Sequence, residues 1–273
     1  MKIEEKYQEL KNLIRSFGSL AVCFSGGVDS TFLLRAASDE LGENVVALTA
    51  VSALIPESEV SESVSFCESN GIRQLIYYFD ALKVEGVRNN PENRCYICKK
   101  NLIGNLKSMA EKEGFSVLAE GSNTDDDGDY RPGMQAVKEL GVVSPLKECC
   151  LNKTEISLLS CQLGLPTWNK PSFACLASRF PYGDEITEEK LKAVELSEKF
   201  LKNLGFLQFR VRIHGHAARM EVLPEQFELV LNNKDLIYEK FKEFGFSYAA
   251  LDLKGFRSGS MNETVKGVFH GTE

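Results

Sequence analysis

The 273-residue sequence lacks several features that define common protein classes. No run approaches the 18 consecutive apolar residues of a membrane span. Residues 1–17 are charged and helical in spacing, without the apolar core of a signal peptide, so we expect a cytoplasmic protein. Eight cysteines are too few for a disulfide scaffold, and closely spaced cysteines in a cytosolic chain more often serve metal or redox chemistry.

Basic residues are also scarce relative to acidic ones. The sequence has 32 Lys and Arg against 39 Asp and Glu, for a net charge of −7. This balance argues against a broad nucleic-acid-binding surface. We therefore expect no nucleic-acid partner and no membrane partner.

Two common nucleotide-binding motifs, GxxxxGK[ST] and GxGxxG, are absent. In their place, Leu20–Phe24 is predicted to form a buried strand and Ser30–Leu41 a helix, joined by a tight turn. Adjacent glycines let a backbone approach a ligand closely. The free N–H groups and the dipole at the start of a helix favour an anion there. The expected phosphate site comprises Ser25, Gly26, Gly27, Val28, Asp29 and Ser30, with Asp29 placed to hold a phosphate-bridging Mg²⁺.

Strand-like and helix-like segments alternate through the first two thirds of the chain. This alternation predicts βαβ units, hence a parallel sheet with helices on both faces. Further strands are expected at residues 44–50, 73–79, 116–119 and 142–145, and further helices at 2–17, 56–70, 101–113, 133–140 and 152–163. From residue 186 the pattern changes to a smaller α+β unit. Its helices are expected at 188–204 and 224–244, and its strands at 207–213, 217–223 and 248–253.

An acidic segment, residues 120–129, follows the strand expected at 116–119. Loops at the carboxyl ends of parallel strands face a common crevice. We therefore expect this segment to share a crevice with the turn at residues 25–29. Gly121, Asn123 and Asp126 are its candidate nucleotide-binding residues. A solvated acidic loop without a ligand remains the alternative.

Three of the cysteines have basic neighbours. Cys95 and Cys98 form a CxxC after a polar loop, and Cys175 has Arg179 four residues later. Three thiolates without an obvious fourth ligand suit an iron–sulfur cluster better than tetrahedral zinc. Three alternatives stay open: a zinc site completed by another cysteine, His214 or His216, a thioredoxin-like redox CxxC, and a purely structural CxxC. Cys23 and Cys161 are expected in the core, where cysteine packs as a small apolar residue.

SGGVDS, the segment RCYICK at residues 94–99 and the segment PSFACLASRFPYG at 171–183 together resemble the LarE-type sulfur transferases. That family belongs to the PP-loop ATP pyrophosphatases and serves nickel-pincer cofactor biosynthesis. The resemblance covers nearly the whole chain, including FRVRIHGHAARMEV at 209–222. It implies a PP-loop domain over residues 1–182 and an α+β substrate-binding or oligomerisation domain over residues 183–273.

The resemblance also implies an activity. ATP would adenylate a carboxylate of pyridinium biscarboxylic acid mononucleotide, and sulfur would then displace AMP to give a thiocarboxylate. The CxxC implies the variety in which Cys95, Cys98 and Cys175 hold a 4Fe-4S cluster as the sulfur source, whereas other members sacrifice the cysteine that matches Cys175.

Site residues and partners follow from the same resemblance. The substrate-binding positions implied are Arg210, Arg212, Glu221 and Glu198, and the catalytic positions are Cys175, Asp29 and Arg179. ATP, Mg²⁺ and the cluster are the expected cofactors. The family implies a homo-oligomer that hands its product to other proteins of nickel-pincer cofactor biosynthesis.

Three other functions stay open. A PP-loop tRNA thiolation enzyme would also pair this loop with cysteines, but it should carry a basic surface. An amide-forming synthetase of the NAD or GMP type would leave the cysteines unexplained. A nucleotide-binding protein without activity would not need Cys175 near the crevice.

Overall fold

The computed structural model describes residues 2–128, 132–171 and 174–257. They divide into two compact units, Met1–Val84 with Cys95–Phe173, and Glu85–Arg94 with Ala174–Glu273. The sequence-based boundary at residues 182 and 183 stays a prediction. The units divide between residues 173 and 174, and the loop at 85–94 belongs to the second.

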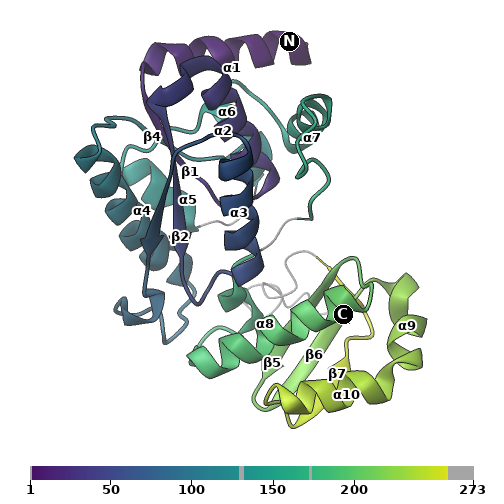
Figure 1. Cartoon of the computed structure of the whole chain (residues 1–273). Coiled ribbons are helices and arrows are strands. Elements are labelled where there is room, and N and C mark those ends of the chain that lie inside the picture. Colours follow the sequence, from purple (N-terminus) through teal and green to yellow (C-terminus); the bar gives the residue numbers. More distant parts are fainter. Residues whose placement is uncertain (1, 129–131, 172–173, 258–273) are drawn as a thin grey trace, which may run out of the picture. The chain divides into compact units, whose positions relative to one another are not determined.

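The first unit is an α/β layer structure (Figure 1). Its elements are α1 (Ile3–Phe17), β1 (Leu20–Cys23), α2 (Val28–Leu41), β2 (Val45–Val51), α3 (Glu57–Ser69), β3 (Gln74–Tyr78), α4 (Arg94–Lys112), β4 (Leu118–Ala119), α5 (Pro132–Glu139), α6 (Pro145–Glu148) and α7 (Lys153–Gln162). The strands are parallel in the order β3-β2-β1-β4. Because β2 and β4 flank β1 on opposite sides, the chain changes direction across the sheet at β1.

Alternate residues of the central strands face two separate cores. Leu20 and Val22 of β1 pack with apolar side chains of α1, α2, α3 and α7. The intervening Ala21 packs with those of α4 and α5. A strand that buries both faces needs a nearly continuous apolar run, and LAVC and VVALTAV supply it. The predicted parallel sheet with helices on both faces is therefore confirmed.

The second unit is a small α+β structure. Its elements are α8 (Glu188–Asn203), β5 (Phe209–His214), β6 (Ala217–Val222), α9 (Phe227–Asn232), α10 (Lys234–Glu243) and β7 (Tyr248–Leu251). β5 and β6 are antiparallel, and β7 adds parallel to β6. Val211, Ile213 and Met220 are buried, whereas the residues between them on β5 and β6 include arginines. The sheet therefore has one apolar face and one charged face.

Three local predictions were wrong. The helix expected at 101–113 begins at Arg94 instead, directly after the Arg94 N–H donates to the Pro91 carbonyl, so the CxxC lies within the first turns of α4. Only Val143 of the expected strand at 142–145 pairs, as an isolated bridge to Ala119, and Pro145 begins α6 instead. Cys161 is exposed on α7 rather than part of the core.

Candidate functional site

The turn after β1 is held by its two serines. The Ser25 and Ser30 hydroxyls lie 3.0 Å apart, and the Ser30 hydroxyl accepts from the Ser25 N–H at 3.3 Å. Gly27 caps α2, and the Thr31 N–H is the first to donate back to it, at 3.0 Å. N–H groups in the first turn have no partner within the helix, so together with the helix dipole they suit an anion.

The segment after β4 lies directly against this turn. A Cβ at Gly121 would come within 3.0 Å of the Ser30 backbone nitrogen and 3.2 Å of the Asp29 carbonyl carbon. A larger residue would force the neighbouring backbone to shift by a few tenths of an ångström. The two segments that the sequence placed in one crevice therefore do adjoin.

The polar groups of the second segment stabilise its own turn. Glu120 is buried and accepts from the Ser122 N–H at 3.1 Å and the Ser122 hydroxyl at 2.8 Å. The Asn123 N–H donates to Asp126 Oδ2 at 3.0 Å. Burial and then the charge of Glu120 raise the pKa of Cys23 at the end of β1 to about 12. Cys23 is therefore a neutral thiol at physiological pH.

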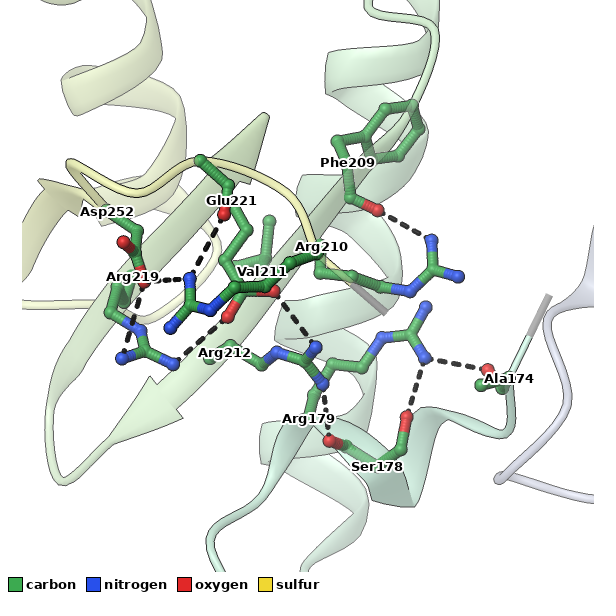
Figure 2. Close-up of polar contacts among 12 residues, drawn as sticks. Ala174, Ser178, Arg179, Phe209, Arg210, Val211, Arg212, Arg219, Glu221 and Asp252 are labelled. Carbon is green, nitrogen blue, oxygen red and sulfur yellow. Dashed lines mark hydrogen bonds and ion pairs between the residues drawn. The ribbon is translucent and has the colours of Figure 1, made fainter. Parts of the chain in front are cut away.

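The charged face of the β5–β6 sheet gathers arginines in the second unit (Figure 2). Arg212 lies opposite Arg219 on the neighbouring strand, and Arg210 lies opposite Glu221. Glu221, fully buried, accepts from Arg212 Nη2 at 2.9 Å and from Arg219 Nη2 at 3.0 Å. Like charges directly across strands are destabilising. Glu221, together with Asp252 at 3.5 Å from Arg219, offsets the repulsion within this arginine pair.

Arg210 carries positive charge in a poor environment for it. Burial, and then the charges of Arg179 and Arg212, lower the pKa of Arg210 to about 10. It is still charged at pH 7, and its guanidinium lies 5.2 Å from the centre of the Phe256 ring. A bound anion would stabilise the charged guanidinium of Arg210. The face therefore suits a ligand that carries phosphate or carboxylate groups.

Arg179, expected to be catalytic, is fully buried. Its Nε and Nη2 donate to the two oxygens of Glu198 at 2.9 and 2.8 Å. Its Nη1 donates to the Ala174 carbonyl at 2.7 Å and to the Ser178 hydroxyl at 2.8 Å (Figure 2). Arg179 thus fixes the segment that carries Cys175 onto α8. Whether it also touches substrate stays a prediction.

The three cysteines of the predicted cluster lie in different units. Cys95 is exposed and Cys98 half-buried on α4 in the first unit, and Cys175 is exposed in the second. Ser172 and Phe173, which shortly precede Cys175 in the sequence, fall outside the described residues. Across residues 2–128, 132–171 and 174–257, no three His, Cys, Asp or Glu side chains are grouped as around a metal ion. The cluster therefore stays a prediction without direct structural support.

Sequence reasoning missed a buried network beside the cysteine segments. Arg94, the residue before Cys95, donates to the Ala177 carbonyl at 3.0 Å and to the Asn90 side chain. The Asn90 amide in turn donates to the Pro181 carbonyl at 2.6 Å. Asn90 is buried and has a φ of +51°, which is uncommon for a residue other than glycine. No sequence pattern predicts its hydrogen-bond partners.

A parallel sheet with an SGGVDS turn after its first strand, contacted by a glycine from the segment after β4, is typical of the PP-loop class of nucleotide-binding proteins. No family model matches the chain. It is 43% identical over 263 residues to an uncharacterised protein of Synechocystis sp., covering 94% of this chain and 98% of that one. It is 37% identical over 257 residues to the pyridinium-3,5-bisthiocarboxylic acid mononucleotide synthase of Lactiplantibacillus plantarum, covering 94% and 92%.

A more distant similarity agrees with the class. A glutamine-hydrolysing GMP synthase component of Thermoplasma volcanium is 26% identical over 208 residues, covering 70% of this chain and 66% of that protein. The level and extent of the identity to the Lactiplantibacillus enzyme show that the chain belongs to the family of the pyridinium-3,5-bisthiocarboxylic acid mononucleotide synthases, the LarE-type sulfur transferases. Within the described residues, no helix is long and apolar enough to cross a membrane.

Proposed function

We propose that this protein is an ATP-dependent sulfur transferase that converts a carboxylate of pyridinium biscarboxylic acid mononucleotide into a thiocarboxylate. The observation that carries the proposal is the turn before α2, closed by Gly121, in a chain that is 37% identical to the Lactiplantibacillus synthase. The synthase's substrate class matches the anionic character expected for a ligand of the β5–β6 face.

The chemistry explains the need for ATP. A carboxylate oxygen attacks the α-phosphorus, the bond to the bridging oxygen breaks, and pyrophosphate leaves from the turn at residues 25–30. A sulfur nucleophile then attacks the activated carbonyl carbon. The carbon–oxygen bond breaks with its electron pair on AMP, a far better leaving group than a carboxylate oxygen. Asp29 and Asp126 are the carboxylates we assign to Mg²⁺ beside the phosphates.

The acceptor's negative groups would bind on the second unit. Arg210 and Arg212 supply guanidiniums that suit a phosphate, and Glu221 orients Arg212. Glu198 accepts the Val211 N–H at 2.9 Å as well as Arg179, which ties β5 to α8. We therefore assign Glu198 a supporting role in this substrate site.

For the sulfur source, we propose a 4Fe-4S cluster held by Cys95, Cys98 and Cys175. The two cysteines of α4 are three residues apart and so lie on one face of the helix, and Cys175 is exposed. A sulfide on the iron without a protein ligand would be the donor.

Sacrifice of Cys175 is the second candidate, favoured by its exposed position. The Cys175 thiolate would attack the carbonyl carbon to form a thioester. Removal of its α-proton would then break the Cβ–S bond, leaving a thiocarboxylate and dehydroalanine. Atoms and electrons balance without an oxidant, and each chain reacts once.

Anaerobic reconstitution separates the two routes. Protein supplied with iron and sulfide is assayed with ATP, Mg²⁺ and acceptor, and the products and the intact protein mass are measured. Repeated turnover with AMP, pyrophosphate and unchanged protein mass supports the cluster. A loss of about 34 Da at Cys175, the mass of hydrogen sulfide, supports sacrifice. Formation of ADP and phosphate would refute the PP-loop chemistry altogether.

Self-association is tested separately. Because the family resemblance implies it, we propose that the protein forms a homo-oligomer and passes its product to other nickel-pincer cofactor biosynthesis proteins. Analytical ultracentrifugation across a concentration series should show a species larger than the 30.4 kDa chain. A single species of that mass at every concentration would rule the oligomer out.

A further inference from the structure

The peptide between Gly26 and Gly27 lies in the middle of the phosphate-binding turn. Gly26 has φ of +72°, and a Cβ there would meet the Glu59 carbonyl oxygen at 3.4 Å. Glycine on both sides leaves this peptide with little intrinsic preference for either orientation. A contact from outside the turn must therefore fix it.

Lys170 makes that contact. Its Nζ donates to the Gly26 carbonyl at 3.1 Å, to Glu59 at 2.8 Å and to Glu62 at 2.7 Å. All these residues belong to the first unit. The Lys170 backbone is itself held, since its N–H donates to the Thr167 carbonyl at 2.9 Å and the next residue is a proline, which restricts it to extended conformations.

In the Gly26–Gly27 peptide, the direction of the carbonyl also sets the direction of the N–H. The bond is trans, as no cis peptide occurs in the described chain, and in a planar trans peptide the N–H points opposite to the carbonyl. With the Gly26 carbonyl held on Lys170, the Gly27 N–H is directed to the other side of the turn. A flip of this one peptide would replace a donor by a carbonyl oxygen, which repels phosphate.

We propose that Lys170 is a positioning residue that keeps the Gly27 N–H directed at the β- and γ-phosphates of ATP. This inference rests on the proposed use of ATP at the turn. Burial lowers the pKa of Lys170, but the hydrogen bonds to Glu59 and Glu62 outweigh it and raise the pKa above its usual value. Two carboxylates also balance its charge, so Lys170 acts on the backbone rather than as a phosphate-binding cation.

The chain contains a matched control in Lys6. Its Nζ likewise donates to a carboxylate, Glu155, at 2.7 Å, and to the carbonyl of a residue with positive φ, Cys150, at 2.7 Å. The Lys6 side chain is 14% exposed and that of Lys170 17%. Lys6 bonds to α7 and to the segment before it, and not to the phosphate-binding turn.

The experiment compares K170M, K170R and K6M with the unaltered protein. Calorimetric titration measures affinity for ATP, pyrophosphate and AMP, with the melting temperature recorded for each variant. K170M should bind ATP and pyrophosphate about ten- to hundredfold more weakly, the loss expected for one charge-assisted hydrogen bond, and bind AMP unchanged. K170R should recover part of the affinity, and K6M should bind all three normally.

Two results would overturn the inference. One is K170M binding ATP and pyrophosphate as tightly as K6M does. The other is an equal loss of AMP affinity, which would indicate general damage to the fold rather than a misdirected N–H group. Failure of the unaltered protein to release AMP and pyrophosphate would instead refute the proposed function, because that measurement does not involve Lys170.

Discussion

Replacing Glu198 by an uncharged residue should lower the unfolding free energy of the second unit strongly, because Glu198 forms a buried ion pair with Arg179. Both side chains are nearly inaccessible, at 0% and 5%, and two parallel hydrogen bonds join them. Glu198→Gln keeps the shape and an oxygen for the Val211 N–H but removes the charge. The buried guanidinium is then uncompensated, which costs about 3–5 kcal/mol of unfolding free energy.

Urea unfolding followed by circular dichroism measures the loss of unfolding free energy. Hydrogen exchange of the β5 amides shows whether the loss is located in the second unit. Arg88→Gln is the control, because its pair with Glu185 is exposed at 53% and 58% and spans 3.7 Å. Exposed pairs contribute about 0–1 kcal/mol, so this variant should hardly differ from the unaltered protein. If Glu198→Gln lowered the unfolding free energy no more than Arg88→Gln, the structural role given to Arg179 would be wrong.

Three further outcomes are expected. Gly121→Ala should reduce AMP release severely, because its Cβ would lie 3.0 Å from backbone, whereas Gly104→Ala in open helical surroundings should add about 0.5–1 kcal/mol of stability. Arg212→Ala should weaken acceptor binding about ten- to hundredfold and leave ATP affinity unchanged in titration; equal losses would move this residue to the nucleotide site. Iodoacetamide at pH 9 should alkylate exposed Cys161 but spare Cys23, whose pKa of about 12 keeps the thiol protonated, and mass spectrometry of the native protein reads the difference.

The sequence carried enough information to predict the sheet and the juxtaposition of its two loops. Apolar runs of four and seven residues identified β1 and β2, since parallel strands are buried on both faces. Once the strands are parallel, their carboxyl ends lie at one edge, and the approach of Gly121 to Ser30 follows. Both predictions depend on local pattern and a general rule of sheet topology.

The contacts that organise the site could not be predicted in this way. Lys170 and Gly26 are separated by 144 residues, and Arg94 and Ala177 by 83. Hydrogen bonds over such distances depend on where the fold brings side chains, which hydrophobic periodicity does not encode. The exposure of Cys161 was missed because polar and apolar residues alternate around it on α7. The sequence pattern then does not decide whether this position faces the core or the solvent.

The charged face of β5 and β6 suits an anionic ligand. Arg210, Arg212 and Arg219 occupy the same face, with Glu221 as the carboxylate paired between the last two. The other face is apolar and packs as a core. Burial, and then the charges of Arg179 and Arg212, lower the pKa of Arg210, so a bound anion would stabilise the charged form of its guanidinium. We therefore propose that the acceptor's phosphate and carboxylates bind at this face.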